Sequence, residues 1–527
     1  MFWGDRIVDE IKTKYTEKIK SGQPLVIRDE KTMSGRVHIG SLRGVAIHGI
    51  ISEILSDQKI NNKYLFEIND FDPMDGLPVY LDQEKFLSFM GKPLLEVPSP
   101  DGKAKNYAEY FAAEFTKVIE GTGFSPEHYR SSELYKAGKY NETIKLALDN
   151  ADKIREIYKK ISGSDKGADW FPVQMICEKC GNIGTTKAIG WDGQQVEYNC
   201  EENMVKWAKG CGYHGKNSPF DGKAKLPWKV EWAAKFKVLG VDIEGAGKDH
   251  STRGGSRDIS EAISREVFGY QPPFNIPYEF FQVGGKKMSS SKGAGSSSRE
   301  IADLLPPEIL RLLLLWKNPN KVIDFIPDGD TIPIIYDTYD KMAESYFKKE
   351  DGDNARIFEL INIDKKKLSE RFLPRFSQIA FLVQMPHMDI LEEVEKIKGS
   401  SLTEEDKEEA LYRAGYAKKW LSAYAPEDYK YELQLDKIPE AAKSFSDEQK
   451  KGLAMILEFI KSHKTLDGQE LHTKIHDIKK ELGINPKDLF SAIYLSFLGK
   501  DSGPKAGWFL SVLDREFLER RLGEVIK

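Results

Sequence analysis

The chain has 527 residues, a formal net charge of −5, and charged and hydrophobic shares of 31% and 40%. These values are ordinary for a globular protein and exclude a strongly basic chain, so any nucleic acid must be bound by local lysine and arginine patches. No apolar run reaches the roughly 18–20 residues that cross a bilayer, and the N-terminus lacks a signal-peptide pattern. We therefore expect a cytoplasmic protein of three to four domains with no membrane partner.

The first functional signal is the turn Met33–Ser41. An apolar run, Pro24–Ile27, predicts a strand before it. A helix is predicted after it by apolar residues on one helical face: Leu42, Ile47, Ile50, Ile51, Ile54 and Leu55. His38 and Gly40 then lie on a strand-to-helix turn, where free N–H groups attract phosphate. The alternative is an ordinary loop histidine.

The next strand-like segment, Lys63–Asn69, runs into an acidic turn that contains Asp70 and Asp72. Ligands of open α/β sheets bind beyond the carboxyl ends of the strands. We interpret Asp72, with Asp70 in reserve, as a carboxylate for a cationic substrate group. The alternative is a solvated Asp-Pro turn.

Four cysteines follow two amphipathic helical segments, Asn106–Ile119 and Tyr140–Ile161. Their spacing is that of a zinc knuckle, and clustered cysteines in a reducing compartment more often mean metal than disulfides. The predicted structural Zn²⁺ site has the ligands Cys177, Cys180, Cys200 and Cys211, with His214 as an alternate ligand. The alternative is four buried cysteines without a metal.

A signal for ribose recognition follows the strand-like segment Val238–Glu244. Gly247 allows a sugar to approach, and Asp249 can accept hydrogen bonds from ribose hydroxyls. Trp228 and Tyr278 are candidates to flank an alkyl-ammonium group. We expect three further aromatic residues to be ordinary core: Trp232, Phe280 and Phe281.

The last signal is the run Gly285–Gly293, Gly-Lys-Lys-Met-Ser-Ser-Ser-Lys-Gly. Glycine gives a loop conformational freedom, and lysine binds phosphate as a point charge. A flexible cationic loop suits a polyphosphate whose charge is redistributed during a reaction. Taken alone, the run fits a solvated linker equally well.

Together, the two phosphate motifs resemble those of class I aminoacyl-tRNA synthetases, whose nucleotide-binding fold carries a "HIGH" motif early and a "KMSKS" motif late. Here they read His38-Ile39-Gly40-Ser41 and Lys287-Met288-Ser289-Ser290-Ser291-Lys292. Ser41 replaces the last histidine, and Ser290 stands where the second lysine is usual. The Lys-Met-Ser-Ser-Ser-Lys-Gly form and the segment Arg253–Asp258 resemble the lysyl version of the family.

The resemblance implies activation of L-lysine with ATP and Mg²⁺, release of pyrophosphate and transfer of lysine to tRNA(Lys). His38, Lys287 and Lys292 would be catalytic, and Asp72 or Asp70 would meet the substrate ammonium with Trp228, His250 and Tyr278 nearby. The implied ATP-binding residues are Gly35, His38, Gly40, Ser41, Gly247, Asp249, Lys287, Met288, Ser289, Ser290, Ser291 and Lys292.

The implied architecture is α/β, a Rossmann-like parallel sheet with an inserted zinc-knuckle connective domain and an all-helical C-terminal anticodon-binding domain. We place the two catalytic halves at residues 1–80 and 226–325, the insertion at 81–225 and the helical domain at 326–527. In the last, caps are predicted at Thr403 and Ser446. Apolar helix faces are predicted at Leu411, Ala414, Ala417 and Leu421, and at Leu453, Ile456, Leu457 and Ile460.

Three alternatives remain at this point, beside the expectation of a monomer. One is a class I synthetase for glutamate or glutamine, although an acidic substrate would favour arginine where Asp72 lies. Another is a tRNA-binding paralogue without activation chemistry. The third is a small-metabolite adenylyltransferase, which needs neither the cysteine module nor the helical C-terminal region.

Overall fold

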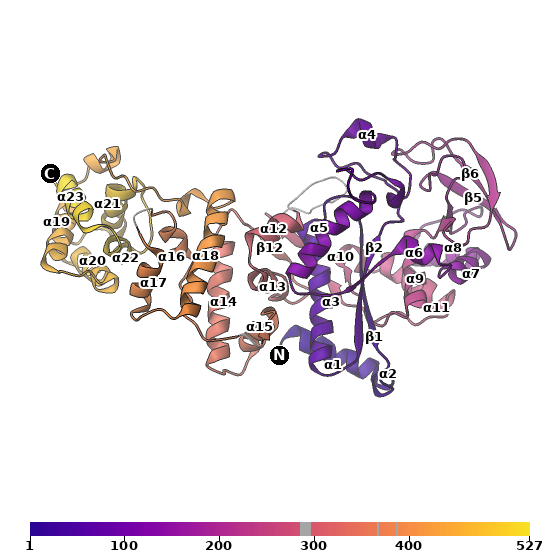
Figure 1. Cartoon of the computed structure of the whole chain (residues 1–527), viewed down its shortest axis with the longest axis horizontal. Coiled ribbons are helices and arrows are strands. Elements are labelled where there is room, and N and C mark those ends of the chain that lie inside the picture. Colours follow the sequence, from indigo (N-terminus) through magenta and orange to yellow (C-terminus); the bar gives the residue numbers. More distant parts are fainter. Residues whose placement is uncertain (285–296, 366–367, 386–387) are drawn as a thin grey trace. The chain divides into compact units, whose positions relative to one another are not determined.

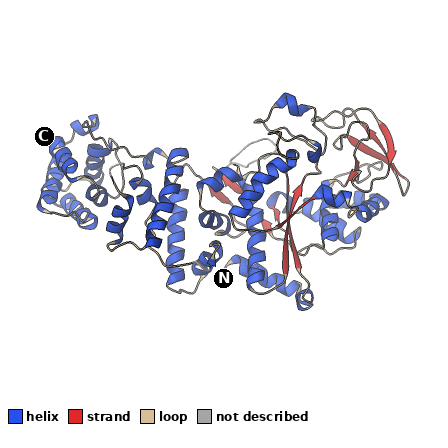
Figure 2. Ribbon diagram, viewed as in Figure 1, coloured by secondary structure: helices blue, strands red, loops and turns tan. Residues whose placement is uncertain are grey.

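The computed structural model describes residues 1–284, 297–365, 368–385 and 388–527. It contains two compact units: Met1–Phe325 with Lys341–Leu368, and Ile326–Asp340 with Ser369–Lys527. All strands of the described chain belong to the first unit, and the second is helical (Figures 1 and 2). No helix in these ranges combines the length and the apolar character needed to cross a membrane.

The first unit is built on a parallel sheet in the order β1-β2-β3, formed by Leu25–Thr32, Asn62–Asn69 and Glu127–Arg130. Single parallel bridges from Ile27 to Ile243 and from Ile243 to Phe274 extend it on the β1 side. The connections are α3, Ile39–Asp57, and α5, Tyr107–Gly121. The predicted α/β class with a parallel sheet is confirmed, because strands joined through helices can run in the same direction.

The residues of the predicted apolar face lie on α3, which is buried on most of its sides, since every residue from Leu42 to Ile51 is buried. Its six predicted residues are all at most 1% exposed. The helix packs against both β1 and β2. It begins directly after His38, so the predicted strand-to-helix turn is present.

One predicted boundary needs correction. Residues 81–225 were expected to form an insertion, but β3 pairs with β2 from Leu65–Ile68 to Glu127–Arg130. The first half of the sheet therefore continues past residue 80 to about residue 130. Between α5 and β3 the chain takes only a short connection, as in a βαβ unit.

The remaining elements of the first unit surround this sheet. The helices are α1 Trp3–Lys14, α2 Thr16–Lys20, α4 Gln83–Leu87, α6 Ser131–Lys136, α7 Asn141–Asp149, α8 Ala151–Ser162, α9 Trp228–Leu239, α10 Lys248–Ser251, α11 Ser256–Glu266, α12 Ser298–Leu304, α13 Pro307–Leu315 and α15 Asp353–Ile361. The strands are β4 Gln174–Met175, β5 Thr186–Trp191, β6 Val196–Cys200, β7 His214–Asn217, β8 Ala224–Lys225, β9 Ala246–Gly247, β10 Pro277–Tyr278, β11 Phe281–Val283 and β12 Ile323–Phe325. Strands β5, β6 and β7 form a separate antiparallel sheet.

The second unit contains helices only. They are α14 Thr331–Phe347, whose last residues belong to the first unit, α16 Phe376–Leu382, α17 Ile390–Lys398, α18 Glu404–Ala423, α19 Asp447–Ser462, α20 Gly468–Leu482, α21 Pro486–Leu498, α22 Ala506–Ser511 and α23 Arg515–Val525. Both predicted caps are capping boxes: Thr403 with Asp406, and Ser446 with Gln449.

One of the two predicted apolar faces in this unit is wrong in part. On α19 the four predicted residues are buried, but on α18 Leu411 is 52% exposed. The buried face of α18 contains Arg413 and Trp420 with the predicted alanines. Arg413 can be buried because its guanidinium pairs with Asp340 and Glu409, which offsets the cost of removing its charge from water. The spacing of apolar residues does not predict such ion pairs.

Candidate functional site

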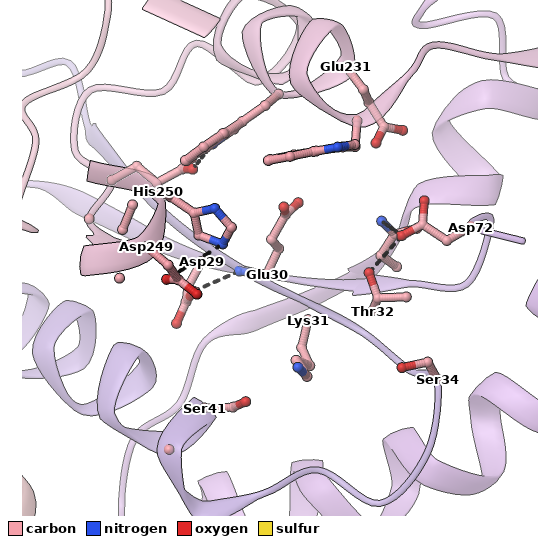
Figure 3. A pocket seen from close by; sticks show the side chains of 18 of the residues that line it. Asp29, Glu30, Lys31, Thr32, Ser34, Ser41, Asp72, Glu231, Asp249 and His250 are labelled. Carbon is pink, nitrogen blue, oxygen red and sulfur yellow. Dashed lines mark hydrogen bonds and ion pairs between the residues drawn. The ribbon is translucent and has the colours of Figure 1, made fainter. Parts of the chain in front are cut away.

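The candidate site is a cavity of about 700 Å³ at the carboxyl ends of β1 and β2. Figure 3 shows side chains from β1, the turn and first residues of α3, the segment after β2 that carries Asp72, helix α9 and the segment around Asp249 facing this one space. The structure brings together most of the predicted site residues. Those on the cavity wall are His38, Gly40, Ser41, Asp72, Trp228, Gly247, Asp249, His250 and Tyr278.

The phosphate end is the start of α3, where His38 is the N-cap residue. A Cβ atom on Gly40 would lie 2.9 Å from His38 Nδ1, so a side chain there would displace the imidazole. The helix has 19 residues, and its first N–H groups have no partner within the helix. This end of the cavity therefore has the electrostatic character of an anion site.

The predicted lysine loop lies outside the described residues, including Lys287, Met288, Ser289, Ser290, Ser291 and Lys292. The residues that flank it are described. Before it, β11 pairs with β12. After it, Ser297 forms an antiparallel bridge with His38, and the Ser298 N–H donates to the Val37 carbonyl over 2.8 Å. The chain on the C-terminal side of the loop is thus fixed to the turn that carries His38.

The opposite part of the cavity is aromatic. The ring of His250 lies 5.6 Å from the ring of Trp228 and 5.9 Å from that of Trp232, centroid to centroid. Trp228 is 48% exposed. The sequence-based expectation that Trp232, Phe280 and Phe281 are core only is incomplete, because all three also line the cavity. An aromatic residue can pack in the core and line a cavity at the same time, and the residue type does not distinguish these two roles.

The third feature is a wall of buried charges. Among the described side chains it contains five carboxylates, from Glu30, Glu67, Asp72, Glu231 and Glu244, and three cations, from Arg28, Lys225 and Lys235. Three of the carboxylates surround the Lys235 ammonium at 2.7–3.2 Å. With all groups ionised, the wall carries two negative charges in excess.

Asp72 is less available to a ligand than the sequence suggested. Its Oδ1 lies 2.8 Å from Lys225 Nζ, and its Oδ2 accepts from Thr32 Oγ1 over 2.7 Å. Burial alone would raise the pKa of Asp72, but the ion pair with Lys225 and the hydrogen bonds outweigh it and lower the pKa. Asp72 therefore lines the cavity as a carboxylate that already has a cationic partner.

Two predicted site residues do not line the cavity. Asp70 is 4% exposed, and its carboxylate accepts from the hydroxyl and backbone N–H of Ser132 and from Ser131 Oγ. It anchors the start of α6, so the reserve role given to it is wrong. Gly35 is buried in the turn before α3 but is not part of the cavity wall.

Four charged residues that were not predicted also line the cavity: Glu30, Lys31, Lys225 and Glu231. A signal was present in β1. A strand of a parallel sheet is normally a continuous apolar run, yet this one continues from Leu25–Ile27 into the charged run Arg28–Lys31. Charges in that position need partners, and they mark the carboxyl end of the strand as unusual.

The four cysteines form a separate cluster. Their Sγ atoms all lie within 4.8 Å of one another, with Cys177 to Cys211 and Cys180 to Cys200 at 3.7 Å. A tetrahedral Zn²⁺ with bonds of about 2.3 Å places its sulfurs about 3.8 Å apart, so the set fits this ion. His214 is outside the cluster, because its ring contacts Asn199 and Glu197.

Comparison with known proteins identifies the family of the chain. Residues 1–364 match the family model described as tRNA synthetases class I (K), and residues 422–526 match an anticodon binding domain. The chain is similar to proteins named lysine--tRNA ligase from three archaea. It is 35% identical to that of Methanosarcina barkeri over 99% of this chain and 97% of the relative. For Thermoplasma volcanium the values are 33%, 100% and 99%, and for Methanocaldococcus jannaschii 33%, 99% and 99%. The chain belongs to the class I (K) tRNA synthetase family.

Proposed function

We propose that this protein is a lysine–tRNA ligase, which activates L-lysine with ATP and transfers the lysyl group to tRNA(Lys). The relatives named for this activity align over nearly the whole chain. The observation that best supports lysine as the substrate is the wall of five carboxylates with three cations. The two uncompensated negative charges attract the side-chain ammonium of a lysine substrate and repel the carboxylate of a glutamate substrate. The wall therefore argues against the glutamate alternative.

Within this wall, Glu30 is the carboxylate best placed to receive the substrate ammonium. Its side chain is 36% exposed, against 23% for Asp72 and 2% for Glu231. A desolvated ammonium needs a carboxylate partner. Arg28 and Lys235 both contact Oε2 of Glu30, and each keeps two other carboxylate partners if Glu30 turns toward the substrate: Arg28 keeps Glu67 and Glu244, and Lys235 keeps Glu67 and Glu231. Asp72 then acts beside Glu30, with its own charge shared by Lys225. Trp228, Tyr278 and His250 enclose the methylene chain.

ATP occupies the other end of the cavity. Its phosphates lie against His38, Gly40 and Ser41 at the start of α3, supported by the turn at Gly35, and its ribose lies against Gly247 and Asp249. Lys287 and Lys292 close over the departing pyrophosphate from the loop whose C-terminal flank is fixed beside His38. The loop residues Met288, Ser289, Ser290 and Ser291 are the rest of this ATP-binding set. Mg²⁺ accompanies the nucleotide.

The reaction needs no protein nucleophile. A carboxylate oxygen of lysine forms a bond to the α-phosphorus, the bond from that phosphorus to the bridging oxygen breaks, and pyrophosphate leaves. A ribose hydroxyl at the 3′ end of tRNA then attacks the lysyl carbonyl and releases AMP. The protein contributes position and charge stabilisation.

The rest of the chain serves the tRNA. The cysteine cluster holds a structural Zn²⁺ through Cys177, Cys180, Cys200 and Cys211 and stiffens the module around β5–β7. This module, within residues 131–225, supports the acceptor end. The second unit binds the anticodon stem, in agreement with the family match over residues 422–526. We expect the protein to act as a monomer.

The test is ATP–pyrophosphate exchange measured with each of the twenty amino acids. Exchange that depends on lysine and not on glutamate or glutamine is the expected result. Exchange with another amino acid would replace the substrate assignment. A protein that binds tRNA(Lys) but catalyses no exchange with any amino acid would be the non-catalytic paralogue.

A further inference from the structure

The two faces of β1 differ in what they contact. Arg28, Glu30 and Thr32 point to the charged wall, where they contact Glu67, Lys235 and Asp72 respectively. Successive strand residues point to opposite faces. Asp29 and Lys31 therefore belong to the other face, which α3 covers.

Asp29 fixes the alignment of strand and helix on that face. Its Oδ2 lies 3.4 Å from His48 Nδ1, and a Cβ atom on Gly44 would lie 3.1 Å from the same oxygen. Helix α3 returns the chain between two parallel strands, so it runs opposite to β1. A step of two strand residues covers about 6.6 Å, which equals about four helix residues at 1.5 Å each. Lys31 thus lies opposite Gly40 and Ser41.

The cavity agrees with this alignment. Lys31 lines it together with His38, Gly40 and Ser41. Figure 3 shows the Lys31 side chain leaving β1 and pointing into the space between Ser34 and Ser41, away from Glu231 and Asp72. Its ammonium faces the end of the cavity where α3 begins.

Lys31 also differs from the other lysines of the site in its pairing. Lys225 and Lys235 each contact at least two carboxylates, whereas no carboxylate of the described residues lies within 4.0 Å of Lys31 Nζ. Burial lowers the pKa of Lys31, and the nearby charges of Asp29 and Glu30 oppose this shift only in part. Lys31 is half-buried on the cavity lining, and a partly desolvated cation without a close anionic partner is unfavourable, which indicates that an anionic group arrives with a ligand.

We propose that Lys31 binds the triphosphate of ATP at the start of α3 and stabilises the charge that develops on the α-phosphate during lysine activation. This rests on the proposed function. Lys31 remains protonated throughout. It interacts with a non-bridging oxygen while the lysine carboxylate oxygen bonds to the α-phosphorus and pyrophosphate leaves with the electron pair of the broken bond. Lys31 is a fixed cation of the sheet, distinct from Lys287 and Lys292 of the loop.

The test compares Lys31→Met with Lys63→Met, an exposed lysine near the start of β2. In lysine-dependent exchange, Lys31→Met should lower kcat/KM for ATP on the order of a hundredfold. The KM for lysine should stay within about twofold, and Lys63→Met should match the wild type. Lys31→Arg, which keeps the charge, should recover part of the loss. If thermal melting shows that Lys31→Met does not fold, Lys31→Gln replaces it.

Direct binding separates this inference from the proposed function. Lys31→Met should weaken binding of ATP but not of adenosine, which has no phosphate, whether or not exchange occurs. Equal ATP binding and equal exchange in both methionine variants would overturn the role of Lys31. A raised KM for lysine with an unchanged KM for ATP would also overturn it, because Lys31 would then meet the amino-acid carboxylate. A wild type that binds ATP but gives no lysine-dependent exchange would overturn the proposed function alone.

Discussion

Removing Lys235 should unbalance the charged wall and destabilise the α/β unit. Its ammonium is 1% exposed and lies 2.7 Å from Glu30, 2.8 Å from Glu67 and 3.2 Å from Glu231. In Lys235→Met five carboxylates share two cations, and breaking a buried pair on one side typically costs about 3–5 kcal/mol. The unfolding entropy of a unit of about 350 residues converts this into a Tm roughly 4–7 °C lower.

The matched control lies on the same helix. Lys237 pairs with Glu142, whose side chain is 70% exposed, and such surface pairs contribute about 0–1 kcal/mol. Differential scanning calorimetry of both variants should therefore show Lys237→Met within about 1–2 °C of the wild type. If the unfolding transition of the α/β unit in Lys235→Met also stayed within about 1–2 °C of the wild type, the ion pairs of Lys235 would not stabilise this unit.

The other predictions concern the metal and the carboxylates. We expect native mass spectrometry to find one equivalent of zinc in the wild type; Cys180→Ser should lose it and melt earlier, whereas His214→Ala should keep it. Zinc retained by Cys180→Ser would contradict the four-cysteine site. Glu30→Gln should raise the KM for lysine more than Asp72→Asn does, because both oxygens of Asp72 have partners, Lys225 and Thr32, whereas Arg28 and Lys235 both contact the same oxygen of Glu30, Oε2; the reverse order would return the main role to Asp72. The net lowering of the pKa of Asp72 from its ordinary 3.8 makes its ionised form stabilising. This stability is present above pH 3.8 and is lost as the pH falls through the lowered pKa. The Tm of Asp72→Asn should therefore fall less than that of the wild type below about pH 4, and parallel curves would contradict this.

Local patterns predicted the elements that carry the cavity. The apolar spacing after His38 identified α3, and the apolar residues of that stretch are buried between the sheet and the helices α1, α12 and α13. The turn chemistry at Gly247 and the cysteine spacing are also short-range signals, and each placed its residues correctly. These residues lie close together in the chain, so short-range patterns predict their positions.

The features that the sequence could not distinguish depend on partners far away in the chain. Asp72 and Asp70 look equivalent in sequence, yet one meets Lys225 and the other Ser131 and Ser132. The same holds for the boundary at residue 80, because the pairing of β3 with β2 is a long-range contact. The charged run of β1 marks Lys31 in the sequence, but its lack of a carboxylate partner among the described residues, on which its proposed role depends, is a long-range property that the run does not predict.

The most direct test is a crystal structure with a non-hydrolysable lysyl-adenylate analogue. We expect the group of the analogue that replaces the phosphate to lie at the start of α3, near Lys31 and His38. We expect its side-chain ammonium to lie within hydrogen-bond distance of Glu30. An analogue bound in the opposite orientation, or outside the cavity, would contradict these expectations.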